Sequence, residues 1–65
     1  MKVEEIRALS TGEIIKQVET AHQELFELRF RAATKQLVNH REIPRVSRNI
    51  ARMEMVLRER VLAAG

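Results

Sequence analysis

The stretch EIIKQVETAHQELFELRFRAATK, residues 13–35, decides the fold. Its apolar residues recur in alternating steps of four and three: Ile14, Val18, Ala21, Leu25, Leu28 and Ala32. This spacing is the heptad seam of a helix that packs along a partner helix, and at about 1.5 Å per residue the helix is a rod of roughly 35 Å. Just before it, Ser10-Thr11-Gly12-Glu13 fits a capping box, so we expect the helix to begin near residue 11.

A second seam of the same kind occupies residues 43–61. Its members are Ile43, Val46, Ile50, Met53, Leu57 and Val61. Residues 36–41 lose the helical period and contain Asn39 and His40, which suit a connector. Pro44 fits the first turn of a helix, so we expect regular helix from about residue 42, with one earlier turn if Asn39 caps it. The sequence therefore predicts an all-α fold, an antiparallel two-helix hairpin with long helices at about 11–35 and 41–61.

A short helix is expected before the hairpin, because Val3, Ile6 and Leu9 stand three residues apart. The first long helix also carries a second apolar stripe, about 100° round from its seam. This stripe consists of Ile15, Phe26 and Ala33, with His22 among them. We expect the N-terminal helix to cover it, and the last residues of the chain, 62–65, to fray.

Three apolar residues of the first long helix are candidates for a protein interface: Ile15, Phe26 and Phe30. Phe30 lies further round the helix than either stripe, and packing against another protein or the N-terminal helix is favoured over stacking on a base. His22 is interpreted as a packed, hydrogen-bonded histidine rather than a ligand. The two histidines, His22 and His40, are far apart in the sequence, so no metal site is predicted.

Length and composition argue against several classes of protein. The 65 residues make one domain, 1–65, of marginal stability, and without cysteine no disulfide or zinc site can staple it. No apolar run approaches the roughly 18 residues that span a bilayer, and no signal-peptide core is present, so we expect a soluble intracellular protein without a membrane partner. No constellation for proton transfer or nucleophilic attack is visible either, and we predict no catalytic residue, cofactor or small-molecule substrate.

Positive charge is concentrated in the middle of the chain. Residues 29–52 hold seven cations against one acid, Glu42, whereas the residues before them sum to −3 and those after them are neutral. The seven cations, which we take as the candidate RNA-binding residues, are Arg29, Arg31, Lys35, Arg41, Arg45, Arg48 and Arg52. The last four cluster within about 60° on the second long helix, about 150° from its seam, and so form one outward stripe.

A solvated face or an acidic protein partner would also explain the stripe. Against a merely solvated face, Arg41/Arg45 and Arg48/Arg52 place like charges four residues apart, and no compensating acid follows on this face until Glu59. A phosphate backbone is therefore the favoured partner. Small helical enzymes such as chorismate mutases also use arginines on long helices, but theirs point into a bundle and these point outward.

Residues 25–37, LFELRFRAATKQL, resemble the signature stretch of the large-subunit ribosomal protein twenty-nine family. The resemblance continues without a gap through Ile43, Val46, Arg48, residues 50–52 and residues 57–60, and it covers essentially the whole chain. It implies a helical hairpin with a short leading helix on the surface of the large ribosomal subunit in the cytoplasm. It further implies contact with large-subunit rRNA, beside the peptide exit tunnel and ribosomal protein twenty-three, close to where targeting factors and chaperones dock.

Carried over by position, the resemblance gives basic, RNA-facing roles to Arg29, Arg31, Arg48 and Arg52. The chain departs from the family pattern at Lys35, where the family commonly has a small residue, often glycine. A longer first helix or an extra cation is therefore expected there. Pro44 and Ser47 also replace residues that are more often basic or helix-favouring. The alternative function is a helical-hairpin interaction module that self-associates or docks on a partner helix.

Overall fold

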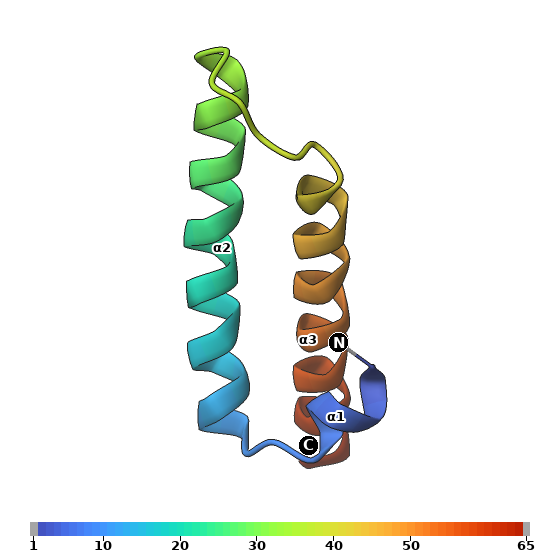
Figure 1. Cartoon of the computed structure of the whole chain (residues 1–65). Helices are drawn as coiled ribbons and strands as arrows, with labels where there is room; N and C mark the ends of the chain where they lie inside the picture. The colour runs from blue at the N-terminus through green and yellow to red at the C-terminus, as the bar shows by residue number, and fades with distance from the viewer. Residues whose placement is uncertain (1, 65) are drawn as a thin grey trace.

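The computed structural model describes residues 2–64, which form three helices. The short helix α1 spans Val3–Arg7, and the two long helices are α2, Thr11–Ala33, and α3, Glu42–Ala64. Figure 1 shows α2 and α3 side by side and antiparallel, joined at the closed end of the hairpin by residues 34–41. The molecule is a rod of 45 × 17 × 16 Å. The predicted all-α hairpin with a short N-terminal helix is confirmed.

Helix α2 begins where the sequence predicts. The hydroxyl of Ser10 accepts a hydrogen bond from the backbone N–H of Glu13 at 3.2 Å. This bond satisfies one of the N–H groups that have no partner within the helix, and it is the serine half of the capping box.

Helix α2 ends at Ala33, two residues earlier than expected, in a Schellman motif. The backbone N–H of Gln36 donates to the carbonyl of Arg31 at 2.9 Å, and that of Lys35 donates to Ala32 at 3.2 Å. Lys35 has a positive φ of 63°, the left-handed conformation that this motif requires. The expectation that Lys35 could prolong the helix is therefore wrong, because its backbone ends it.

Helix α3 is preceded by a turn at Asn39. The side-chain oxygen of Asn39 accepts from the backbone N–H of Arg41 at 3.1 Å, and its carbonyl accepts from that of Glu42 at 3.0 Å. Pro44 is the third helical residue, where its missing N–H costs no intrahelical hydrogen bond. The helix continues to Ala64, so residues 62–64 extend it beyond the expected end, and Gly65 lies outside the described residues.

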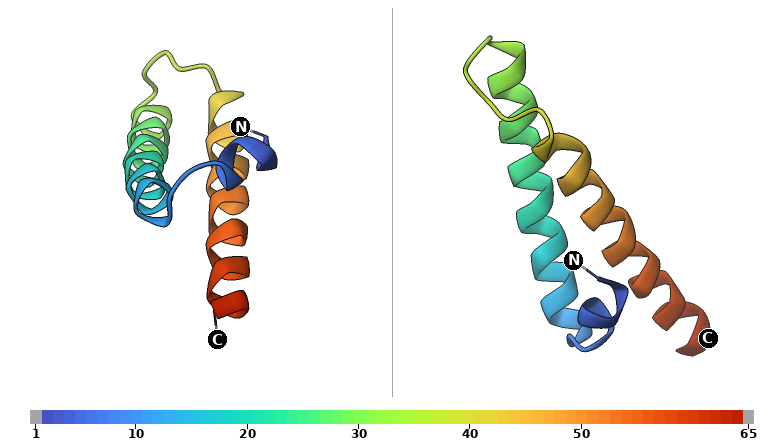
Figure 2. Two further views of the ribbon diagram at one scale, coloured as in Figure 1. Left: turned by 90° about the horizontal axis from the view of Figure 1, so that it is seen from below. Right: turned by 45° about the vertical axis from the view of Figure 1, so that its right-hand side comes forward.

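Two apolar clusters hold the hairpin together. Near the closed end, α2 and α3 pack through Leu25, Val46 and Ile50. Near the open end the cluster also includes α1, and its buried members are Ile6, Ile14, Met53 and Val56. Figure 1 shows α1 beside the C-terminal half of α3, the right view of Figure 2 shows it near the N-terminal end of α2, and α1 and α3 are in contact.

The position of α1 corrects two expectations from the sequence. Because α1 covers the side of α3 that carries Val56, this residue is buried although it lies outside the predicted seam, whereas the predicted seam residue Val61 is 70% exposed. Conversely, α1 does not cover the second stripe of α2, where Ile15 and Phe26 remain exposed.

Candidate nucleic-acid interface

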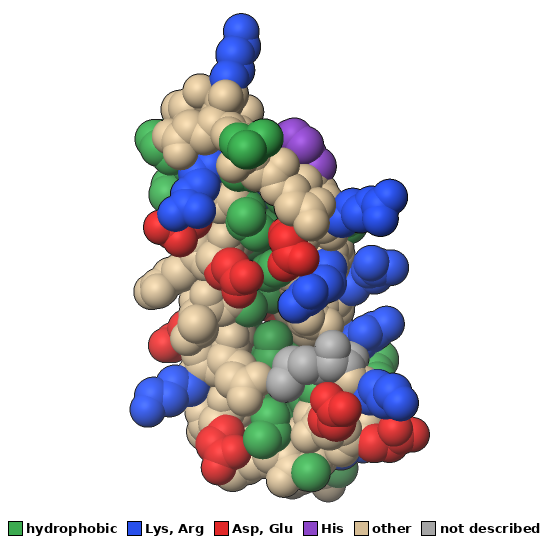
Figure 3. All heavy atoms as spheres, in the orientation of Figure 1, with side chains coloured by type: hydrophobic (Ala, Val, Ile, Leu, Met, Phe, Trp, Pro, Cys, Tyr) green, Lys and Arg blue, Asp and Glu red, His purple; other side chains and the backbone are tan. Residues whose placement is uncertain are grey.

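The predicted basic stripe forms one face of α3. All four of its arginines are exposed: Arg41, Arg45, Arg48 and Arg52. Figure 3 shows Lys and Arg side chains projecting along the outer edge of α3, whereas cations and acids are mixed along α2. Because the apolar seam of α3 is turned toward α2, the residues about 150° away from it point into solvent. We call these four arginines the basic face.

The basic face is not entirely without acid. Nη1 of Arg45 lies 3.2 Å from Oε1 of Glu42, one turn earlier on the same helix. The expectation that no compensating acid would be found before Glu59 is therefore wrong at this position. An exposed pair of this kind is worth only a few tenths of a kcal/mol, so a phosphate can displace the carboxylate at small cost.

The three other predicted cations lie near the closed end, and all are exposed: Arg29, Arg31 and Lys35. Arg29 and Arg31 are about 160° apart around α2, so they cannot form one surface. Arg31 pairs with Glu27 at 3.7 Å, four residues earlier, in the order expected from the sequence. The structure thus collects four of the seven cations on one face and spreads the rest around the end of α2.

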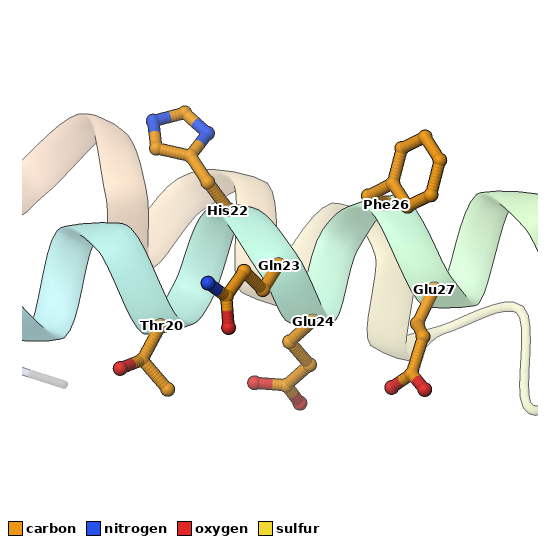
Figure 4. Close-up of a pocket in the computed structure, with 6 residues that line it drawn as sticks. All are labelled: Thr20, His22, Gln23, Glu24, Phe26 and Glu27. Atoms are coloured by element: carbon orange, nitrogen blue, oxygen red, sulfur yellow. The ribbon is translucent and has the colours of Figure 1, made fainter.

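A depression lies on the surface of α2. Figure 4 shows the residues that line it, with His22 and Phe26 on one side of the helix and Thr20, Glu24 and Glu27 on the other. The two groups point in opposite directions and do not enclose a cavity. Within residues 2–64, no group of three His, Cys, Asp or Glu is placed to hold a metal ion, and no helix is long and apolar enough to cross a membrane.

The sequence is similar to a known family over nearly its whole length. A family model described as Ribosomal L29 protein matches residues 4–60. The chain belongs to this ribosomal protein family. A relative named large ribosomal subunit protein uL29, from Dehalococcoides mccartyi, is 58% identical over 62 residues, which cover 95% of each chain. The relative of the same name from Geobacillus stearothermophilus is 50% identical over 65 residues, which cover 100% of this chain and 98% of the relative.

Membership in the L29 family confirms the resemblance seen at residues 25–37 and in the second long helix. It makes the chain a structural, non-enzymatic constituent of the large ribosomal subunit in the cytoplasm, with rRNA and ribosomal proteins as its partners. The exposed arginines of α3 form a positively charged surface on this chain.

A polar clamp at the open end was not predicted from the sequence of this L29-family chain. Nη2 of Arg60 donates to the carbonyls of Leu9 at 2.8 Å and Arg7 at 3.2 Å, and its Nη1 donates to Oγ1 of Thr11 at 3.0 Å. Arg7 in turn pairs with Glu59 at 3.2 Å. These contacts join residues about 50 positions apart in the chain, so no local sequence pattern predicts them.

The predicted protein-facing residues of this L29-family chain remain accessible. Phe26 is 72% exposed, and Ile15 and Phe30 are about half exposed. Nε2 of His22 lies 3.3 Å from the accepting Oε1 of Glu54 on α3, so the expected hydrogen bond is present, but the side chain is more than half exposed rather than packed.

Proposed function

We propose that this chain binds large-subunit rRNA through the basic face of α3, beside the peptide exit tunnel and ribosomal protein twenty-three. One observation carries the proposal: a ribosomal protein presents four exposed arginines on a single face of a helix. Targeting factors and chaperones at the tunnel exit would then be its transient neighbours.

The mechanism is phosphate and sugar contact with little base readout. Guanidinium groups present a rigid fork of donors that matches phosphate oxygens, so a row of them fixes the position of a helix on folded RNA. Only two aromatic residues, both Phe, are present in the whole chain, so stacking on unpaired bases contributes little. The basic face therefore positions the protein on rRNA of a given shape.

The test is the salt dependence of binding to a full-length large-subunit rRNA transcript. Each phosphate contact contributes about 0.7 to 0.9 to the slope of log affinity against log salt. The triple variant Arg45→Gln, Arg48→Gln, Arg52→Gln should therefore flatten the slope by about 2 to 3. Filter binding or fluorescence anisotropy at several salt concentrations gives the slope.

A matched control removes the same charge elsewhere: Lys2→Gln, Lys16→Gln, Arg58→Gln. These cations lie on three helices or their ends, outside the basic face, and all are exposed. This control should keep a slope close to that of the unchanged chain. Equal slopes for the two triple variants would mean that only total charge matters and that the basic face has no special role.

The proposed location needs its own test. A photo-crosslinking amino acid at position 30 should capture ribosomal protein twenty-three in assembled large subunits, because Phe30 is exposed near the closed end. The same residue at position 48, on the basic face, should capture rRNA instead. Crosslinks to proteins far from the tunnel exit would refute the location while leaving rRNA binding intact.

The exposed apolar residues of α2 support a second candidate function, a module that self-associates or docks on a partner helix. Ile15, Phe26 and Phe30 follow one side of α2 and would be covered by such a partner. Analytical ultracentrifugation of the chain without RNA separates the two candidates. A stable dimer that Phe26→Ser dissociates would support self-association, and a monomer at all concentrations would exclude it.

A further inference from the structure

The tip of the hairpin presents an apolar side chain that has no role in the fold. Leu37 is fully exposed, at 103% of its reference area, whereas its neighbour Val38 is half-buried. Isolated exposed leucines are common on protein surfaces, so exposure by itself proves nothing. Three further features of the connector distinguish this one.

The first feature is that the connector is held at both ends. At its start, the Schellman motif ties Gln36 to Arg31, and at its end the side chain of Asn39 binds the N–H of Arg41. Figure 1 shows this segment rounding the end of α2 before it descends to α3. Leu37 thus lies on a short, anchored tip, and ordering it on a partner costs less entropy than ordering a free loop.

The second feature is the charge around the tip. Residues 28–41 contain four cations and no acid. An acidic surface is therefore the complementary partner, and among acidic surfaces a nucleic acid adds sugars and base edges that an apolar group can touch.

The third feature is the backbone of Lys35, two residues before Leu37. A non-glycine residue at φ 63° costs about 1–2 kcal/mol, which glycine would avoid. A cation, Lys35, occupies this strained position. Its exposed side chain places positive charge at the end of the hairpin.

We propose that the tip is a second RNA-contact element, in which Leu37 packs on sugars and base edges of folded rRNA and Lys35 contacts a phosphate. This inference rests on the proposed function, because it takes large-subunit rRNA as the partner. The wide, shallow minor groove of an A-form helix displays sugars and base edges that a protruding side chain can reach. The basic face then binds rRNA mainly through charge, and the tip binds it mainly through apolar contact.

The salt dependence of affinity distinguishes the two kinds of contact. Leu37→Ser should lower affinity for the full-length large-subunit rRNA transcript by about tenfold at every salt concentration, with an unchanged slope, because it removes apolar burial and no charge. Lys35→Gln should instead flatten the slope by about 0.7 to 0.9. Both variants should keep the melting temperature and the far-UV circular dichroism of the unchanged chain, since neither side chain is buried.

The matched control is Leu62→Ser, which removes an exposed leucine from the opposite end of the hairpin. It should leave affinity unchanged.

If Leu37→Ser binds like Leu62→Ser while the triple arginine variant still flattens the slope, the tip is not an RNA contact and the proposed function stands. If the triple variant has no effect but Leu37→Ser weakens binding, the tip inference survives and the basic face fails. A Leu37→Ser variant that binds rRNA normally but is lost from assembled subunits would place Leu37 against a protein and overturn the inference.

Discussion

At the scale of single residues, Lys35 has a backbone conformation that its side chain disfavours. Left-handed conformation suits glycine, which has no Cβ, although glycine also gains more freedom in the unfolded chain. On balance Lys35→Gly should raise the free energy of unfolding by about 0.5–1 kcal/mol. Urea unfolding followed by circular dichroism measures the change.

Lys35→Ala is the control for this prediction, because it removes the charge but keeps a Cβ at φ 63°. It should bring no gain in stability. If the tip binds RNA as proposed, Lys35→Gly should also flatten the salt slope, so the same substitution that stabilises the chain weakens its binding. A lower urea midpoint for the glycine variant would contradict the conformational argument.

The cap of α2 is a second single-residue contribution. Ser10→Ala removes the acceptor for the N–H of Glu13 and should cost about 1 kcal/mol, while Ser10→Gly should cost only a few tenths. Thermal unfolding of the two variants under identical conditions compares them. An alanine variant as stable as the unchanged chain would show that the hydroxyl is not the source of the stability.

At the scale of elements, α1 depends on α3 for its place. Five residues are too few for a stable isolated helix, so α1 persists through Ile6 in the core and through the hydrogen bonds of Arg60 to the carbonyls of Arg7, its last residue, and of Leu9. Arg60→Gln should cost about 1–2 kcal/mol, because it removes charge-assisted hydrogen bonds that are only partly buried.

Hydrogen exchange gives the more specific measurement for this prediction. In Arg60→Gln the amides of Ile6, Ala8 and Leu9, which are hydrogen-bonded in the native chain, should exchange faster, while those of the middle of α2 change little. Arg58→Gln, an exposed neighbour on α3, is the control and should leave exchange as it is. Uniform acceleration along the whole chain would mean that Arg60 supports global stability and not α1 in particular.

At the scale of the whole molecule, the core is small, and so the partner contributes to stability. Among residues 2–64, seven apolar residues are buried in two clusters along a rod 45 Å long. A chain of this size is marginal by itself, and any ligand that binds only the folded form stabilises it by mass action. With free rRNA transcript at 100 times the dissociation constant, the free energy of unfolding should rise by about 2.7 kcal/mol.

The triple arginine variant tests this linkage. Pulse proteolysis in urea, with and without the transcript, reports the fraction unfolded even in the presence of RNA. The unchanged chain should shift its midpoint with RNA concentration, and the triple variant should shift much less at the same concentration. A midpoint of the unchanged chain that does not respond to saturating RNA would show that binding and folding are not coupled.

The sequence by itself determined the features that depend on neighbours within a few positions. The seam of α2, the seam of α3 as far as Leu57, the Ser10 cap, the turn at Asn39 and the outward arginines of α3 follow from helical geometry and local hydrogen bonds, and they are present as predicted. The early end of α2 could be missed because one backbone dihedral at Lys35, and not the period of the side chains, ends the helix.

Only the tertiary structure decided which side of the hairpin α1 covers. That choice buries Val56, leaves Ile15 and Phe26 exposed, and gives Arg60 the carbonyls of Arg7 and Leu9. Each of these outcomes depends on packing between residues roughly 50 positions apart, where several arrangements satisfy the same local pattern and the total burial selects one.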